Sequence, residues 1–125
     1  MAEELEIIEG YRKRAREELE ASRLALDGRF YAASISRGYY AVYYAMCALL
    51  SEKGIVTKSH RQTGIEFRKN FVKTGTVERK YSDILDKLFT IRMESDYDAI
   101  PNIDERLAKK LLQDAHDFVE RMLQL

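Results

Sequence analysis

Disulfide bonds, long apolar runs and an excess of charge of one sign are all missing from this sequence. Cys47 is the only cysteine among 125 residues, so no intrachain disulfide can form. Lys plus Arg and Asp plus Glu each number 21, so net charge predicts no polyanionic partner. The longest apolar run, at 41–50, is half of the roughly 20 residues that cross a bilayer. No membrane partner is expected, and an N-terminus without the regions of a signal peptide predicts a cytoplasmic protein.

Several catalytic signatures are also absent. The chain has no Gly-rich phosphate loop of the form G-x-G-x-x-G or G-x-x-x-x-G-K. Neither histidine, His60 or His116, has a glutamate three residues before it, as the di-iron sites of helical bundles require. With two histidines and one cysteine, a zinc site would depend heavily on carboxylates. The sequence therefore predicts no metal site and no cofactor.

What the sequence does contain is amphipathic helix along most of its length. Apolar residues recur at helical spacing in four long segments and one short one, and no alternating strand pattern competes with them. A chain of 125 residues has the usual size of one domain, so residues 1–125 are expected to form a single helical domain. The prediction is an all-α, up-and-down bundle of four long helices, with a shorter helix between the second and the last two.

Glycines and capping residues predict where these helices stop and start. The first helix covers residues 5–26, and the second runs from about Tyr31 to Lys53. Because glycine accepts the left-handed backbone of a helix C-terminus without steric cost, the expected stops are Gly28, Gly54 and Gly75. The residues spaced to cap helix N-termini are Ser59 with Gln62, Thr76, and Asn102 with Glu105.

The second predicted helix is rich in tyrosine and should form the centre of the core. Its apolar side chains occupy two adjoining stripes, a pattern typical of a helix buried on most sides. The tyrosine faces could instead stack on bases, but helical spacing favours core packing with the hydroxyls at the rim. Cys47 is expected to pack there as a small hydrophobe. The stripes read Ala33, Arg37, Tyr40, Tyr44, Cys47 and Leu50, and Tyr39, Tyr43 and Met46.

The other helices supply the remaining core residues, again at helical spacing. The expected set is Leu5, Ile8, Ala15, Leu19 and Leu26, then Ile65, Phe67 and Phe71, then Val77, Tyr81, Ile84, Leu85 and Leu88, and finally Ile103, Leu107, Leu111, Phe118 and Met122.

Basic residues gather around the short third helix. Residues 58–73 contain a single acid, Glu66. They also contain several cations and one histidine that could bind a phosphate backbone. The alternative is a solvated face of a short amphipathic helix. The candidate phosphate- or nucleic-acid-binding residues are Lys58, His60, Arg61, Arg68 and Lys69.

Arg92 occupies a position where the helical stripe predicts an apolar side chain. It follows Leu88 on the buried face, so its guanidinium should enter a cleft or an interface and needs a partner there. A planar, permanently charged guanidinium is suited to holding a phosphate. The alternative is an intrahelical ion pair with Asp96, one turn later on the same face.

Two segments together resemble the HEPN domain family in its small stand-alone form. They are SRGYYAVYYAMCALLSEKGIVTKSH at 36–60 and IRMESDY at 91–97. The resemblance implies a helical bundle that dimerises. It also implies a partner, since many members are encoded beside a minimal nucleotidyltransferase in toxin–antitoxin or related systems. Active members of the family are metal-independent ribonucleases.

The family signature is an arginine followed, after four to six residues, by a histidine. The resemblance implies that Arg92 contacts the scissile phosphate, but positions 97 to 99 are Tyr, Asp and Ala, so the histidine of proton transfer is missing. Asp96 and Tyr97 remain candidate site residues beside Arg92. His60, at a helix N-terminus, is the histidine that could substitute if the fold brings it to Arg92.

Three hypotheses follow from these residues. The first is a HEPN-type module that dimerises and binds a partner nucleotidyltransferase, a nucleotide or an RNA phosphate near Arg92. The second is a metal-independent ribonuclease that uses Arg92 with Tyr97, Asp96 or His60. The third is a helical scaffold in which Arg92 only pairs with Asp96 or crosses a dimer interface.

Overall fold

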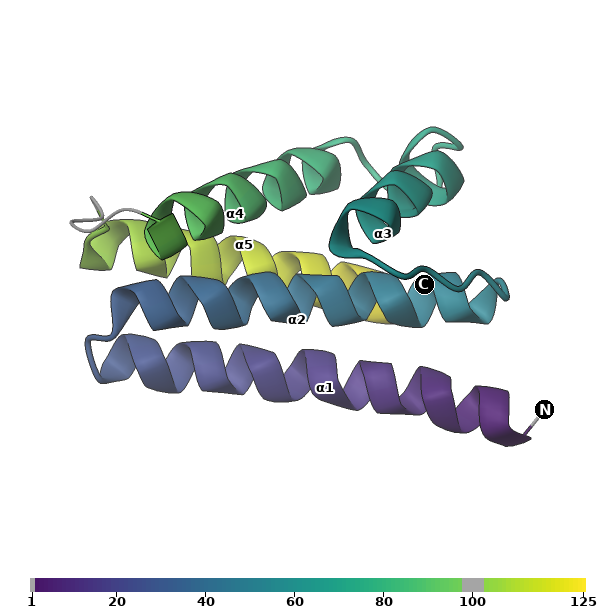
Figure 1. Ribbon diagram of the computed structural model, residues 1–125, viewed down its shortest axis with the longest axis horizontal. Helices are drawn as coiled ribbons and strands as arrows, with labels where there is room; N and C mark the ends of the chain where they lie inside the picture. Colours follow the sequence, from purple (N-terminus) through teal and green to yellow (C-terminus); the bar gives the residue numbers. More distant parts are fainter. Residues whose placement is uncertain (1, 98–102) are drawn as a thin grey trace.

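The protein, described by a computed structural model, is a bundle of α-helices (Figure 1). Its elements are α1 (Ala2–Asp27), α2 (Tyr31–Glu52), α3 (His60–Phe67), the π-helical turn η1 (Arg68–Val72), α4 (Lys80–Tyr97) and α5 (Glu105–Leu123). The structure describes the backbone of residues 2–97 and 103–125 and the side chains of residues 2–94 and 103–125. Within those ranges there is no strand, and the predicted all-α bundle with four long helices and a short one is confirmed.

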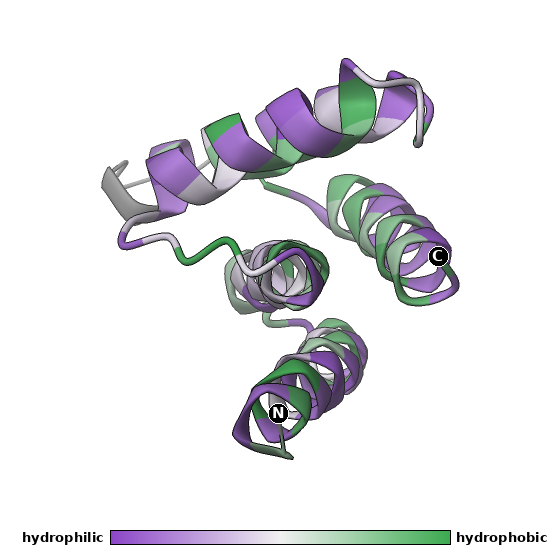
Figure 2. Ribbon diagram, turned by 90° about the vertical axis from the view of Figure 1, so that its right-hand side faces the viewer, coloured by the Kyte–Doolittle hydropathy of each residue, from purple (hydrophilic) through white to green (hydrophobic). Residues whose placement is uncertain are grey.

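Helix α2 lies at the centre of the bundle. It contacts α1, α3, α4 and α5, and the end-on view shows it with α1 below, α5 to the right and the α3 and α4 layer above (Figure 2). More than half of its residues are buried, including Tyr39, Met46 and Cys47. This is the arrangement that its two adjoining apolar stripes predict, because only a helix covered on most sides can bury so wide a surface.

The turn between α1 and α2 is a Schellman motif with arginine at its left-handed position. The N–H of Phe30 donates to the carbonyl of Ala25 (2.8 Å), and the N–H of Arg29 to that of Leu26 (3.0 Å). Arg29 has a φ of 65°, so the prediction that Gly28 would adopt this conformation is wrong. A Cβ atom at position 28 would lie 3.1 Å from the Phe30 ring, which gives the glycine a packing role instead.

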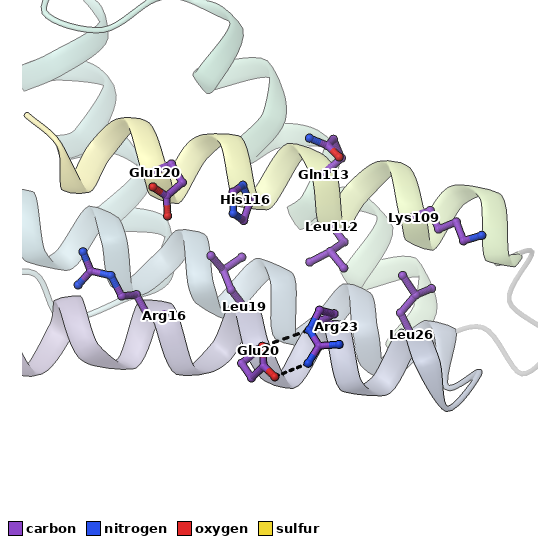
Figure 3. A pocket seen from close by; sticks show the side chains of 10 residues that line it. All are labelled: Arg16, Leu19, Glu20, Arg23, Leu26, Lys109, Leu112, Gln113, His116 and Glu120. Atoms are coloured by element: carbon purple, nitrogen blue, oxygen red, sulfur yellow. Dashed lines mark hydrogen bonds and ion pairs between the residues drawn. The ribbon is translucent and has the colours of Figure 1, made fainter.

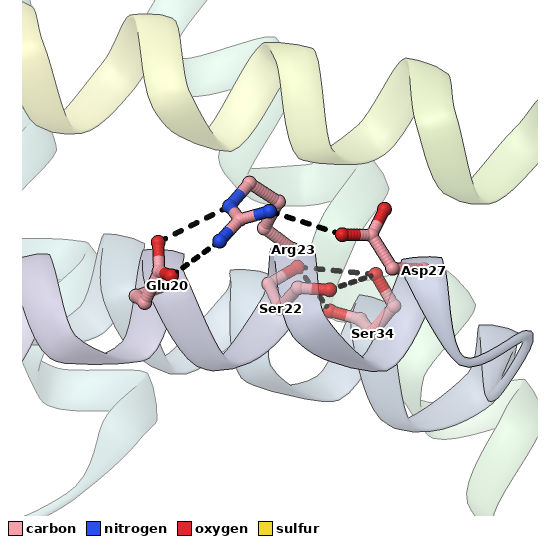
Figure 4. A network of polar contacts seen from close by, with 5 residues as sticks. All are labelled: Glu20, Ser22, Arg23, Asp27 and Ser34. Atoms are coloured by element: carbon pink, nitrogen blue, oxygen red, sulfur yellow. Dashed lines mark hydrogen bonds and ion pairs between the residues drawn. The ribbon is translucent and has the colours of Figure 1, made fainter.

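Two buried serines join α1 to α2 (Figure 4). The Ser22 hydroxyl donates to the backbone carbonyl of Ser34 (2.7 Å), and the Ser34 hydroxyl donates to that of Ser22 (2.9 Å). Close by, a Cβ atom on Gly38 would lie 3.6 Å from the Ser22 hydroxyl oxygen. These small residues let the two helices approach closely, and both buried hydroxyls find partners.

Helix α3 starts as predicted. The Ser59 hydroxyl accepts from the N–H of Gln62 (3.0 Å), while the Gln62 side chain accepts from the N–H of Lys58 (2.9 Å) rather than from that of Ser59. Gly54 and Gly75, with φ of 73° and 78°, provide the predicted left-handed stops before and after this segment.

The helix that follows Ser59 packs differently from the prediction. Phe67 and Phe71 are buried, but Ile65 is 49% exposed and is not a core anchor. The π-helical turn at Arg68–Val72 places more residues in one turn than an α-helix does, so regular helical spacing does not describe its faces.

Two helix starts also differ from prediction. Helix α4 begins at Lys80, so Thr76 does not cap it and Val77 is buried ahead of the helix. At α5 the cap is Asp104, whose side chain accepts from the N–H of Leu107 (2.9 Å). Asn102, the predicted cap, lies outside the described residues.

Most of the predicted core residues are buried. Besides Ile65, two members of the predicted set, Leu5 and Ala33, are exposed. Leu5 is 63% exposed, because the first turns of α1 lie beside the end of α2 and the exposed Val56, which do not cover it. The buried members of the predicted set outside α2 are Ala15, Leu19, Phe67, Phe71, Val77, Tyr81, Leu85, Leu88, Leu111, Phe118 and Met122.

Candidate functional site

Arg92 lies against the tyrosines of α2. Helix α4 carries it there because Leu88, one turn earlier, is fully buried in the core. Its Nη2 donates to the Tyr40 hydroxyl (3.3 Å), and its guanidinium carbon stands 5.2 Å from the ring centroids of both Tyr39 and Tyr40. A cation over aromatic faces is attracted by their quadrupoles, which helps to hold a half-buried charge.

His60 contacts the same tyrosines from a different helix, α3. As the first residue of α3, it is placed by the Ser59 cap. Its Nδ1 forms a hydrogen bond with the Tyr39 hydroxyl (2.8 Å), and its ring stacks on that of Tyr43 at a centroid distance of 4.1 Å. The edge of its ring also meets Tyr40, 5.7 Å away.

The fold therefore brings Arg92 and His60 into one cluster, the tyrosine cluster, formed by Tyr39, Tyr40, Tyr43, His60 and Arg92. Sequence spacing could not show this, since the two residues belong to different helices and meet only through α2. Burial lowers the pKa of the His60 imidazole, and the nearby charge of Arg92 lowers it further.

The phenols of Tyr39 and Tyr43 and the imidazole of His60 are neutral at physiological pH. Burial raises the pKa of Tyr39 to about 12, against the opposing effect of Arg92, and burial also raises that of Tyr43 to about 12. Burial, together with Arg92, lowers the pKa of His60 below its ordinary value of 6.5. Arg92 then supplies the charge of this cluster, and the neutral groups around it can donate or accept hydrogen bonds.

A second arginine borders the cluster. The guanidinium carbon of Arg37 lies 4.9 Å from the Tyr40 ring centroid, and its Nη1 pairs with Glu18 (3.1 Å). Arg37 was predicted only as a member of a core stripe. Its signal in the sequence is the same as that of Arg92, a cation at a position where the stripe predicts an apolar residue.

The predicted basic surface around α3 is divided by the fold. Of its members, His60 alone belongs to the tyrosine cluster. Arg68 is engaged elsewhere: its Nε donates to the Ser82 hydroxyl (2.8 Å), and its Nη2 pairs with Asp86. Lys58, Arg61 and Lys69 are exposed. Of the residues predicted beside Arg92, Asp96 and Tyr97 belong to the last turn of α4, and their side chains lie outside the described residues.

A groove of about 730 Å³, apart from the tyrosine cluster, lies between α1 and α5 (Figure 3). Leu19, Leu26 and Leu112 point into it, and its rim mixes both signs of charge, with Arg16 and Lys109 against Glu120. His116, the other histidine, lines this groove, so it does not supply the histidine missing after Arg92.

Among the described residues, no three His, Cys, Asp or Glu side chains are grouped so that they could hold a metal ion. None of the described helices combines the length and the apolar character needed to cross a membrane.

Comparison with known proteins identifies the family. The HEPN domain profile matches residues 8–125. The chain is 32% identical to a UPF0332 protein of Thermotoga maritima, over 100% of this chain and 95% of that protein. It is also 32% identical to the Methanocaldococcus jannaschii protein named "Putative toxin MJ0142", over 87% of this chain and 74% of that one.

The fold has a counterpart among solved structures. The crystal structure of an archaeal HEPN homologue superposes with a TM-score of 0.64 at 19% identity, covering 94% of this chain and 95% of the other. At that identity the likeness concerns the fold, which agrees with the profile match over nearly the whole chain. The chain belongs to the HEPN domain family.

Proposed function

We propose that this chain is the HEPN module of a toxin–antitoxin-like system and binds an RNA phosphate at Arg92. The observation that supports this is the placing of a half-buried guanidinium on two tyrosine rings, beside a neutral imidazole. Two relatives that cover most of this chain carry the word toxin in their names, which supports the system to which we assign it.

The chemistry of the cluster suits a phosphate. Guanidinium groups bind phosphate oxygens through paired N–H donors and remain charged at any physiological pH. The Tyr40 hydroxyl accepts from Arg92 and keeps its own proton to donate to a phosphate oxygen. Because the phenols of Tyr39 and Tyr43 stay protonated, neither brings a negative charge against the ligand.

Replacing Arg92 tests the proposal. Arg92→Ala should weaken binding of a fluorescein-labelled single-stranded RNA at least tenfold, about 1.4 kcal/mol, as measured by fluorescence anisotropy. Arg92→Lys should restore part of the affinity, since it keeps the charge but loses the planar fork. Arg23→Ala is the matched control, because it removes the same charge from an exposed pair on α1.

The scaffold hypothesis gives the opposite result. If Arg92 only stabilises the bundle, Arg92→Ala will lower the melting temperature while the folded variant binds RNA as the wild type does. Circular dichroism on the same samples separates loss of fold from loss of binding.

A second function, metal-independent cleavage of the bound RNA, is favoured by the position and charge state of His60. A neutral imidazole can accept the proton of the ribose 2′-hydroxyl as its oxygen forms a bond to the adjacent phosphorus. The bond from phosphorus to the 5′-oxygen breaks, the leaving oxygen takes up a proton from water, and the imidazolium of His60 returns its proton to the solvent. Arg92 would stabilise the charge on the phosphate oxygens during this exchange.

Cleavage is tested in buffer that contains EDTA. The products should carry 2′,3′-cyclic phosphate ends, and His60→Gln should lower the single-turnover rate by about 100-fold or more, as loss of a general base does. Arg92→Ala should lower it at least tenfold, about 1.4 kcal/mol in the barrier, because the charge on the phosphate oxygens loses its partner. RNA that binds but stays intact with the wild type over hours would remove this second function and leave the first.

Dimerisation and a partner nucleotidyltransferase are further parts of the proposal, supported by membership of the family. Light scattering after gel filtration should give a mass of about twice that of the chain, 14.6 kDa. Co-expression with the neighbouring nucleotidyltransferase gene, where one exists, should yield a complex that survives purification. A monomer with no such partner would count against this part alone.

A further inference from the structure

A groove of about 430 Å³ between α3 and α4 adjoins the tyrosine cluster. Tyr39 and His60 belong to both, so the groove opens next to the place where Arg92 lies. Volumes of about 300–1,000 Å³ are usual for sites that hold small ligands.

Two apolar side chains from different helices are exposed in this groove. Phe89 of α4 is 41% exposed and Ile65 of α3 is 49% exposed, and both line it. Phe89 also packs on Tyr39, with ring centroids 5.9 Å apart. A flat aromatic face is therefore offered to any ligand that enters, directly beside the buried tyrosine that Arg92 covers.

Phe89 and Arg92 share one side of α4. Residues three apart on a helix are neighbours on its surface, and both side chains meet Tyr39, at 5.9 Å and 5.2 Å. In a ligand that places a phosphate at Arg92 and a planar group on Phe89, the two groups would be only as far apart as neighbouring side chains on one helix. A nucleotide combines these two groups.

The charges at the groove agree with this ligand. Exposed Arg61 lies on its α3 side, and Asp86 on its α4 side is paired with Arg68. Arg61, which is outside this pair, lines the groove beside His60 and Tyr39, and it would favour a polyanionic strand there. Arg68 and Asp86 also offer a donor and an acceptor at the groove wall for the edge of a base.

We propose that the groove between α3 and α4 holds one base of a single-stranded RNA, stacked on Phe89, while the adjoining phosphate lies at Arg92. This inference rests on the proposed function and adds to it a subsite for a base. Stacking on an aromatic face accepts any base, so the subsite selects single strands rather than a sequence.

The chain contains no tryptophan, so Phe89→Trp would place a single indole in the groove, whose emission can be excited apart from that of the tyrosines, and would keep a stacking face there. A short oligoadenylate should quench this fluorescence in a saturable way, because the base stacks on the indole. Ribose 5-phosphate, which has a phosphate but no base, should not quench it. In Phe89→Trp with Arg92→Ala, the midpoint of quenching should move to at least tenfold higher oligoadenylate concentration.

Leu24→Trp is the matched control. Leu24 lies on α1, is 58% exposed and lines none of the grooves described above, so its indole should not respond to oligoadenylate. A second variant, Phe89→Ala, should weaken binding of labelled RNA by about five- to 100-fold, the usual range for loss of one stacked base. Leu24→Ala should leave that affinity unchanged.

The outcomes separate the subsite from the function on which it rests. If Arg92→Ala weakens RNA binding but Phe89→Ala does not, the subsite is wrong and the phosphate site stands. Wild-type protein that binds no RNA overturns both. An indole at position 89 that responds to a co-purified partner protein and not to oligoadenylate would show that the groove receives protein, which also overturns the subsite.

Discussion

Tyr39 is the residue on which the candidate site depends. Its side chain is 1% exposed, its hydroxyl bonds His60, and its ring lies under Arg92 and against Phe89. Burial gives the ring a fixed position, since a packed aromatic side chain has few rotamers open to it. Three side chains from two other helices are thereby positioned relative to a single rigid group.

His60 gives the protein a specific response to acid. Its folded-state pKa is lowered, so below about pH 6.5 the unfolded chain binds more protons at this position than the native state. The free energy of unfolding should therefore fall as the pH drops from about 6.5 toward the folded-state pKa, because the imidazole would carry its charge in a partly buried position and would also face the charge of Arg92.

Urea titrations between pH 5 and pH 7.5 measure this effect. His60→Gln should flatten the decrease, and His116→Gln, at an exposed position on α5, should leave it as in the wild type. A decrease that is the same in wild type and His60→Gln would show that other groups cause it.

The sequence predicts the position of a single residue, and whether it is buried, where that residue belongs to a helical stripe. The stripe places Leu88 in the core and Arg92 one turn later on the same face, and the structure agrees. The position of His60 could not be predicted, because its contacts with Tyr39 and Tyr43 join residues 21 and 17 positions away, after a turn and a loop. Phe89 lies outside the buried stripe and gave no signal at all.

At the scale of the elements, Arg29 gives the α1–α2 turn a backbone strain that a glycine at this position would relieve. A side chain with Cβ at the left-handed position costs roughly 1 kcal/mol relative to glycine. Arg29→Gly should therefore raise the free energy of unfolding by about 0.5–1 kcal/mol, since the Schellman hydrogen bonds stay in place. Arg29→Ala keeps the Cβ atom and serves as the control. Equal stability of the two variants would contradict this reading of the turn.

The Ser22–Ser34 pair should be the more sensitive polar contact of the α1–α2 interface. Ser34→Ala removes a buried hydrogen bond and leaves the Ser22 carbonyl without that donor, which should cost about 1–3 kcal/mol in urea unfolding. Arg23→Ala breaks the exposed pairs with Glu20 and Asp27 seen in Figure 4 and should leave the melting temperature unchanged. Similar losses in both variants would rule out this ranking.

The sequence predicted which segments form helices, but it did not predict the geometry of the turns between them. Amphipathic periodicity identifies all five α-helices, because it reflects which face is buried. The π-helical turn after Phe67 and the delayed start of α4 at Lys80 depend on tertiary packing around the buried Phe71 and Val77. Ile65 precedes the π-helical turn and is two residues from the buried Phe67, so the two side chains lie on different sides of α3 and Ile65 lines a groove instead of the core.

For the whole molecule, the site is an assembly of two helices on a third. Tyrosines of α2 receive His60 from α3 and Arg92 from α4, and α1 and α5 complete the bundle on the other sides of α2 (Figures 1 and 2). The family and the fold were predictable from the sequence, since segments 36–60 and 91–97 contain the resemblance and the profile match extends over residues 8–125. The convergence of His60 and Arg92 follows only from the fold.

Helix α4 packs on α2 with much less contact than α1 does. Elements held by few contacts open with a smaller free energy than the whole fold, and native-state hydrogen exchange measures that difference. Amides of α4 between Leu85 and Ile91 should exchange at lower denaturant than those of α2 between Val42 and Leu49, and equal exchange in both would mean that the bundle opens as a unit. Arg92 and Phe89 both belong to α4. Local opening of this one helix would therefore remove both side chains from the site while α1, α2 and α5 stay folded.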